Sequence, residues 1–178
     1  MFGFRKLVIF MAVIIAALWL VACQATPPAA DEAKFQTQIY LVRHAEKTKD
    51  KNDPALTIAG QERAQLLAEK LADAGITRIH SSDYTRTRDT AQPLADRLGL
   101  TVELYDPRDL PAMAEKLKGA IGTHLVVGHS NTTPPLTELL GGEGGEPIVE
   151  ATEYDRLYRV DITKDGSASS KLMRFGAR

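Results

Sequence analysis

The feature that most constrains the fold of this chain is an alternation of strand-like and helix-like segments between Gln38 and Leu140. Four short apolar or alternating segments are each followed by a segment with helical signals, which predicts successive strand–helix units. Two further strand-like segments follow, joined by a turn sequence that contains Asp and Gly. This order predicts a three-layer α/β/α domain with a mainly parallel sheet and a C-terminal antiparallel hairpin. The expected strands cover residues 38–43, 76–80, 100–105, 124–128, 157–163 and 171–175.

Local signals set the limits of the expected helices. Thr57 has a side chain suited to cap the first helix, and Gly75 is expected to end it. One of residues 81–83 (Ser, Ser or Asp) is expected to cap the second helix, and Gly99 to end it. The two later helices are expected over residues 109–118 and 133–140, the last with two prolines that its first turn tolerates.

The N-terminal segment has a composition of its own. Arg5 and Lys6 precede an unbroken apolar run from Leu7 to Val21. A membrane-spanning helix needs about 20 apolar residues, whereas the apolar part of a secretory signal has about 7–15. The run ends in Leu-Val-Ala before Cys23, and a Pro/Ala-rich stretch follows. This arrangement resembles the lipobox of bacterial lipoproteins.

The lipobox resemblance implies a location as well as a processing event. We expect a lipoprotein signal peptide over residues 1–22, a lipid on Cys23, and a flexible tether over residues 23–35. The protein would then be anchored to a membrane of the bacterial cell envelope, outside the cytosol. Gln24 after the cysteine resembles the sorting pattern for the periplasmic side of the outer membrane in a Gram-negative cell. The alternative is an uncleaved anchor helix in which the cysteine is incidental.

Composition excludes several classes of function. The chain has 178 residues, of which 44% are hydrophobic and 25% charged, as in an ordinary globular domain. Its net charge of −1 lacks the basic excess of a nucleic-acid-binding surface, so we expect no nucleic-acid partner. A single cysteine excludes an intrachain disulfide.

Polar side chains gather at the ends of the expected parallel strands. Arg43 and His44 end the first strand, Arg86 follows the second, and His129 ends the fourth. The carboxyl ends of parallel strands share one edge of the sheet, where ligands bind, so we expect these residues to lie close together. Guanidinium groups bind tetrahedral oxyanions, and a neutral imidazole can attack phosphorus. The cluster predicts phosphoryl transfer from a monoester, first to His44 and then to water, without a metal ion because the cations would repel it.

Four segments, in order, resemble a known family. Residues 41–46 (LVRHAE) resemble the Arg-His-Gly/Ala-Glu signature of the histidine phosphatase superfamily, which has the phosphoglycerate-mutase-like fold. Residues 56–64 resemble its Leu-Thr-x-x-Gly-x-x-Gln-Ala helix entry, and residues 81–91 its Ser-Ser-x-x-x-Arg-Thr-x-x-Thr-Ala segment. Residues 126–131 resemble the segment with the second histidine. The resemblance spans residues 38–163.

The resemblance implies roles for particular residues within a histidine phosphatase domain over residues 36–178. His44 is implied as the nucleophile, Arg43 and Arg86 as phosphate ligands, and His129 as the residue that completes the phosphate pocket. No cofactor is implied. The substrate is expected to be a small phosphorylated molecule.

The proton donor is not assigned by the resemblance. Larger members of the family supply a carboxylate from an insertion that this chain lacks. Glu46, Asp53, Asp106 and Glu153 are candidates, with Glu46 preferred as an acid that also contacts substrate. Asn131 either binds substrate or caps the following helix.

Other polar residues have structural explanations. His80 and His124 are expected to pack within the sheet. The Gly-His-Ser sequence at residues 128–130 does not form a serine-hydrolase nucleophile elbow, because that motif requires Gly where Thr132 stands.

The predicted function is therefore a metal-independent phosphomonoester hydrolase, acting on an envelope sugar phosphate or another small phosphoester. The alternatives are a non-catalytic envelope module that binds phosphorylated ligands and a phosphomutase. Specificity is expected to depend on the loops at 47–54, 106–112 and 141–154.

Overall fold

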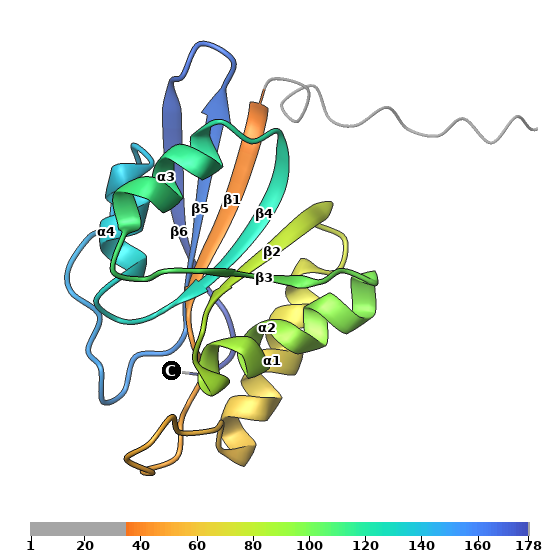
Figure 1. Cartoon of the computed structure of the whole chain (residues 1–178), viewed down its shortest axis with the longest axis vertical. Coiled ribbons are helices and arrows are strands. Elements are labelled where there is room, and N and C mark those ends of the chain that lie inside the picture. Colours follow the sequence, from red (N-terminus) through yellow and green to blue (C-terminus); the bar gives the residue numbers. More distant parts are fainter. Residues whose placement is uncertain (1–34, 178) are drawn as a thin grey trace, which may run out of the picture.

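The computed structural model describes residues 35–177 (Figure 1). The expected signal peptide, the lipid attachment site at Cys23 and all of the tether except Phe35 lie outside the described residues. Within 35–177, no helix has both the length and the apolar character needed to cross a membrane.

A six-stranded mixed sheet forms the middle layer, in the order β3-β2-β4-β1-β5-β6. Strand β1 lies between β4, to which it is parallel, and β5, to which it is antiparallel. The expected mainly parallel sheet with a C-terminal antiparallel hairpin is confirmed. The strands are β1 (Phe35–Arg43), β2 (Ile76–Ser82), β3 (Val102–Tyr105), β4 (Gly122–Gly128), β5 (Arg156–Thr163) and β6 (Ala168–Arg174).

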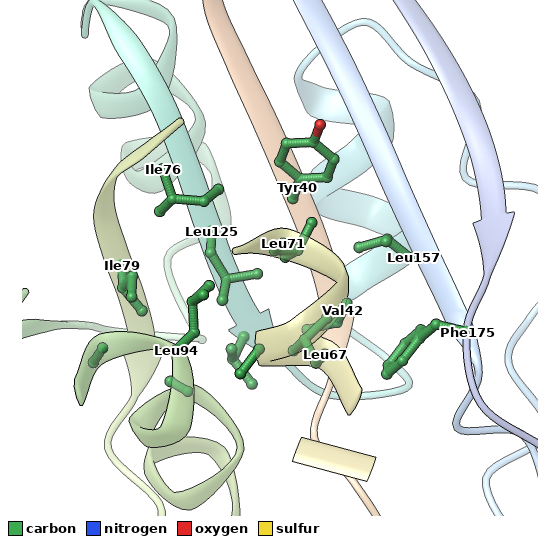
Figure 2. Packing of buried hydrophobic residues seen from close by; sticks show 14 residues of the cluster. Tyr40, Val42, Leu67, Leu71, Ile76, Ile79, Leu94, Leu125, Leu157 and Phe175 are labelled. Atoms are coloured by element: carbon green, nitrogen blue, oxygen red, sulfur yellow. The ribbon is translucent and has the colours of Figure 1, made fainter. Parts of the chain in front are cut away.

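Two helices cover each face of the sheet, which completes the expected three layers (Figure 1). Helices α1 and α2 bury Leu67, Leu71 and Leu94 against Leu125 of β4 and Val42 of β1 (Figure 2). Helices α3 and α4 pack their apolar residues against the opposite side of β1, β4 and β5. The helices are α1 (Ile58–Leu71), α2 (Thr85–Leu98), α3 (Leu110–Lys118) and α4 (Thr133–Leu139).

The helix ends agree with the sequence signals in part. Thr57 caps α1 as expected, since its hydroxyl oxygen accepts a hydrogen bond from the backbone N–H of Gly60 at 3.1 Å. Gly99 ends α2 in the left-handed conformation, with φ of 66°. Helix α1 stops at Leu71, and the expected end at Gly75 is wrong because a turn at residues 72–75 leads into β2.

The expected cap of α2 from residues 81–83 is also wrong. Tyr84 occupies the N-cap position, and its side chain makes no capping hydrogen bond. The carboxylate of Asp53 accepts the hydrogen bond from the backbone N–H of Thr85 at 2.9 Å. This cap comes from a loop that is distant in sequence, so the residues next to α2 do not indicate it.

The topology creates a binding position beyond β1 and β4. Helices α1 and α2 lie on one face of the sheet and α3 and α4 on the other, so the chain leaves β1 and β4 toward opposite faces. Ligands bind in the crevice that such a reversal leaves at the carboxyl ends of neighbouring strands. The backbone N–H of His44 donates to the carbonyl oxygen of Gly128 at 2.9 Å, which holds the two strand ends together at this position.

Candidate active site

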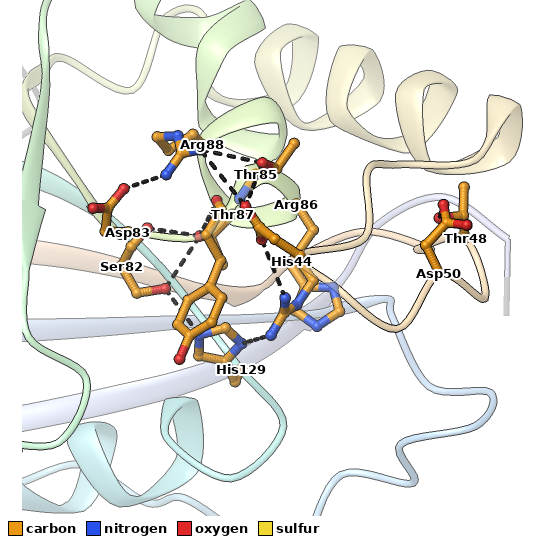
Figure 3. Close-up of polar contacts among 12 residues, drawn as sticks. His44, Thr48, Asp50, Ser82, Asp83, Thr85, Arg86, Thr87, Arg88 and His129 are labelled. Carbon is orange, nitrogen blue, oxygen red and sulfur yellow. Dashed lines mark hydrogen bonds and ion pairs between the residues drawn. The ribbon is translucent and has the colours of Figure 1, made fainter.

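The structure brings together the four residues expected to bind and transfer phosphate. Arg43 ends β1, His44 follows it, Arg86 lies in the first turn of α2, and His129 follows β4. The ring centroids of His44 and His129 are 5.5 Å apart, at an interplanar angle of 67°. Nη2 of Arg86 lies 3.4 Å from Nδ1 of His129 (Figure 3). A cleft of about 410 Å³ opens onto His44, Arg86 and His129.

His44 is held as a neutral imidazole with one defined free nitrogen. Its Nδ1 lies 2.7 Å from the carbonyl oxygen of Ala45, which can only accept, so Nδ1 carries the proton and Nε2 keeps its lone pair. Burial lowers the pKa of His44 to about 3; the bond to Ala45 opposes this shift, and the charges of Arg43 and Arg86 add to it. At neutral pH the Nε2 atom is therefore available as a nucleophile.

The two arginines present buried donors without partners. Arg43 is 2% exposed, its Nη1 donates to the carbonyl oxygen of Glu153 at 3.0 Å, and its guanidinium lies 4.1 Å from the ring centre of Tyr154. The guanidinium of Arg86 lies 4.5 Å from the ring centre of Tyr84. Within residues 35–177, Nε and Nη2 of Arg43 and Nε of Arg86 are buried without a hydrogen-bond partner. Buried donors are normally paired, so these atoms indicate a site for an anion.

His129 is oriented by Ser82, which was expected from the sequence only as a possible helix cap. Nε2 of His129 lies 2.8 Å from Oγ of Ser82, and the Ser82 hydroxyl donates to Oγ1 of Thr87 at 3.1 Å (Figure 3). Because that hydroxyl proton is engaged, Nε2 of His129 carries the proton that Ser82 accepts, and Nδ1 faces Arg86. Burial, with the charges of Arg86 and Arg43, lowers the pKa of His129 to about 4.

Comparison with known proteins agrees with this geometry. The family model described as "Histidine phosphatase superfamily (branch 1)" matches residues 39–108. Over this segment the chain is similar to the histidine phosphatase superfamily. The match agrees with the superfamily expected from the motifs.

Curated relatives match this chain over a limited segment. "Probable phosphoglycerate mutase GpmB" of Erwinia tasmaniensis is 41% identical over 78 residues, which are 40% of this chain and 36% of the relative. The protein of the same name from Yersinia pestis is 42% identical over the same shares. The matched segment thus spans about a third of the length of these relatives.

Solved structures share the fold over most of this chain. The protein histidine phosphatase SixA, in complex with tungstate, aligns with a TM-score of 0.62 at 22% identity, over 77% of this chain and 96% of that chain. A mycobacterial glucosyl-3-phosphoglycerate phosphatase aligns with a TM-score of 0.60 at 17% identity, over 79% of this chain and 99% of that chain. These likenesses confirm the expected fold.

Glu46, the preferred proton donor, lies in an ion pair outside the cleft lining. Nε and Nη2 of Arg63 donate to its carboxylate at distances of 2.8 to 3.0 Å. Arg63 also donates to the carbonyl oxygens of Phe175 and Ala177, which ties the C-terminal segment to α1. Burial alone raises the pKa of Glu46, but the hydrogen bonds and charge of Arg63 outweigh it and lower the pKa. This carboxylate therefore braces the fold and is poorly placed to donate a proton.

The other carboxylates named as proton donors are also engaged by neighbours. Hydrogen bonds from neighbouring residues lower the pKa of Asp53. Such hydrogen bonds also lower the pKa values of Asp106 and Glu153 to about 2. Such groups stay ionised at neutral pH, so none of the three is a ready acid. Asp53 accepts from Thr85, Asp106 from Arg108, and Glu153 from Arg156 and Arg174.

Three charged residues of the cleft were not expected from the sequence to be site residues. Lys47, Arg108 and Glu150 line it, together with Asn131, which does lie where a substrate-binding residue is expected. The loops that carry these three residues were expected to affect specificity, but no local pattern separates them from other exposed residues of those loops. The remaining lining residues are His44, Tyr84, Arg86, Pro107, His129, Ser130 and Thr132.

His80 and His124 lie together inside the sheet, away from the cleft lining. Both are almost fully buried, their rings stack with centroids 5.4 Å apart, and Nε2 of His80 lies 3.1 Å from Nδ1 of His124. Burial lowers the pKa of both residues, that of His80 to about 4. Their place agrees with the packing role expected for them.

Proposed function

We propose that this histidine phosphatase is a phosphomonoester hydrolase that forms a covalent phosphohistidine on His44. One observation carries the proposal: a neutral His44 with a free Nε2 lies beside the unpartnered guanidinium donors of Arg43 and Arg86. The donors suit the equatorial oxygens of a phosphoryl group, and the free nitrogen suits attack on its phosphorus. No metal ion is needed, because the guanidinium groups supply the countercharge.

The reaction proceeds in two displacements. Nε2 of His44 attacks phosphorus, the P–O bond breaks, and the alcohol leaves once its oxygen has gained a proton. Water then attacks the phosphorus of phospho-His44, and the N–P electron pair returns to Nε2. Nδ1 of His129 accepts a proton when the dianion offsets the charges of Arg43 and Arg86, and then donates to a phosphoryl oxygen.

We further propose that the protein is a lipoprotein of the bacterial cell envelope, with residues 1–22 removed and Cys23 lipidated. The support is the sequence pattern around Cys23. An envelope location favours a sugar phosphate or another small phosphoester as substrate. That a solved relative is named as a glucosyl-3-phosphoglycerate phosphatase supports a small sugar-containing phosphoester.

A phosphomutase is the second candidate, because the matched curated relatives carry the name phosphoglycerate mutase. A mutase returns the phosphoryl group from His44 to a hydroxyl of the substrate, whereas a hydrolase transfers it to water. A mutase therefore produces an isomeric phosphoester with little inorganic phosphate.

Phosphate release from p-nitrophenyl phosphate by the chain without residues 1–22 tests the proposal. We expect His44→Ala to abolish release, and Arg86→Ala to lower kcat/KM by about 10²-fold or more, the scale of losing one transition-state donor. Arg88→Ala is the matched control, because Arg88 lies on the same helix but outside the cleft lining. Rapid quench of wild type should trap a phosphoenzyme that is labile to acid and absent from His44→Ala.

Two results would contradict the hydrolase. Binding of a phosphoester without release, equal in wild type and His44→Ala, would indicate a non-catalytic binding module. Conversion of 3-phosphoglycerate to its isomer, faster than phosphate release, would indicate a mutase.

A further inference from the structure

The strongest unassigned feature of the molecule is a single carboxylate in the active-site cleft. Glu150 is the one acidic residue that lines this cleft within residues 35–177, and it shares the cleft with His44, Arg86 and His129. No hydrogen bond or ion pair with another described residue engages its side chain. Glu150 differs in this respect from Glu46 and Glu153, whose carboxylates form ion pairs with arginines.

The turn that carries Glu150 is fixed to the phosphate site. The backbone N–H of Glu153 donates to the carbonyl oxygen of Val149 at 2.8 Å, and that of Val149 donates to Oε2 of Glu153 at 3.1 Å. Nη1 of Arg43 donates to the carbonyl oxygen of Glu153 at 3.0 Å. The two bonds between Val149 and Glu153 close the turn around Glu150, and the third attaches the turn to Arg43.

The residue after this turn packs directly on the site. The ring centre of Tyr154 lies 4.1 Å from the guanidinium of Arg43 and 6.3 Å from the ring centre of His44. Burial lowers the pKa of Arg43, and the charge of nearby Glu150 is among the effects that oppose this shift. Glu150 thus lines the cleft and lies within electrostatic range of Arg43.

Resting on the proposed hydrolase, we propose that Glu150 is the catalytic residue that donates the proton to the leaving oxygen. When the P–O bond breaks, its electron pair stays on the leaving oxygen, which takes the proton from Glu150 as Nε2 of His44 bonds to phosphorus. In the second step Glu150 accepts a proton from the attacking water, and the N–P electron pair returns to Nε2. The products are an alcohol and inorganic phosphate, and Glu150 is protonated again.

A proton donor in the cleft selects a class of substrate. Sugar and alkyl hydroxyls are poor leaving groups and require a proton as the P–O bond breaks, whereas p-nitrophenolate leaves without one. General acid catalysis contributes about 10²–10⁴-fold to such steps. A proton donor at Glu150 therefore indicates that the site acts on monoesters of sugars and other aliphatic alcohols.

The test compares one variant on two substrates. For Glu150→Gln we expect kcat for glycerol 2-phosphate to fall by about 10²-fold or more, and kcat for p-nitrophenyl phosphate by less than about tenfold. Glu146→Gln is the control, because Glu146 is exposed on the same loop but outside this cleft, and it should behave as wild type.

The outcomes separate this inference from the proposed function. Equal losses on the two substrates, no loss on either, or the same pattern in Glu146→Gln would each overturn the role of Glu150. If His44→Ala abolishes phosphate release while Glu150→Gln shows no substrate-dependent loss, the hydrolase stands and only this inference fails. If wild type releases no phosphate from either ester, the proposed function fails. Thermal melts of each variant check that a loss of activity is not a loss of fold.

Discussion

Nδ1 of His44 lies 2.7 Å from the carbonyl oxygen of Ala45, the next residue in the chain. This contact sets the tautomer of the nucleophile, because a carbonyl oxygen must receive a proton. The contact is local, so the residue that follows the nucleophile also orients it. Burial beside Arg43 and Arg86 then keeps the ring neutral.

The low pKa of His44 predicts activity in acid. With a pKa of about 3, His44 in the free enzyme remains unprotonated at pH 5. An ordinary histidine, with a pKa of about 6.5, would be mostly protonated there and would lower kcat/KM about 30-fold. We expect kcat/KM for an aryl phosphate, corrected for ionisation of the substrate, to show no enzyme group titrating between pH 5 and 7. An acid limb near pH 6.5 that persists after this correction would contradict the assignment.

Ser82 is predicted to be a positioning residue for His129. Ser82→Ala removes the acceptor of the Nε2 proton, so the imidazole can adopt the other tautomer and rotate. We expect kcat to fall about tenfold and stability by about 1 kcal/mol, the usual contribution of one hydrogen bond. The chemical shifts of the His129 ring nitrogens should change as well, which a purely structural role would not require.

The neighbouring serine provides the control for this experiment. Ser81 is equally buried, and its hydroxyl donates to the backbone carbonyl oxygen of Ser82 rather than to His129. Ser81→Ala should keep the His129 ring spectrum of wild type. If both variants lose activity equally with unchanged ring spectra, Ser82 acts on the fold alone.

Glu46 is predicted to affect stability more than chemistry. Glu46→Gln leaves the guanidinium of Arg63, which is 8% exposed, without its carboxylate. Breaking a largely buried pair of this kind costs about 3 kcal/mol, which lowers Tm by about 6–12 °C in a domain of this size. We expect kcat at 20 °C to change less than about threefold, and Arg63→Gln to have a similar effect on Tm. A large loss of kcat with an unchanged Tm would restore Glu46 as a proton donor.

The stacked pair of His80 and His124 predicts loss of stability in acid. Burial lowers both pKa values, that of His80 to about 4, whereas in the unfolded chain each is about 6.5. Between these values the unfolded state binds more protons than the folded state, so the free energy of unfolding falls as pH decreases from about 6.5 toward 4. Urea unfolding at pH 7, 5.5 and 4.5 measures this decrease.

A substitution isolates the contribution of this pair. His80→Gln removes a titrating group from the stack. The free energy of unfolding of the variant should therefore depend less steeply on pH than that of wild type, although we expect the variant to be less stable than wild type at pH 7. An unchanged slope would show that other groups cause the acid sensitivity.

Local sequence patterns were sufficient for most of the architecture. Hydrophobic periodicity located the strands and helices, and Thr57 and Gly99 end their helices through hydrogen bonds or backbone conformations within a few residues. The cap of α2 could not be predicted in this way, because Asp53 lies 32 residues before the N–H that it accepts from. The break at Leu71 had no local signal, since Gly75 is the residue that favours a helix end.

In the active site, too, local sequence determined some features and tertiary structure determined others. Arg43, His44 and His129 follow from the sequence, because parallel strands bring their carboxyl ends to one edge and residues at those ends must meet there. Which carboxylate faces the cleft was decided by tertiary structure alone. Glu46 is close to His44 in the chain but pairs with Arg63 of α1, whereas Glu150 is remote in sequence and lines the cleft. Strand ends are set by short-range patterns, but the partner of a charged side chain depends on which distant segments fold against it.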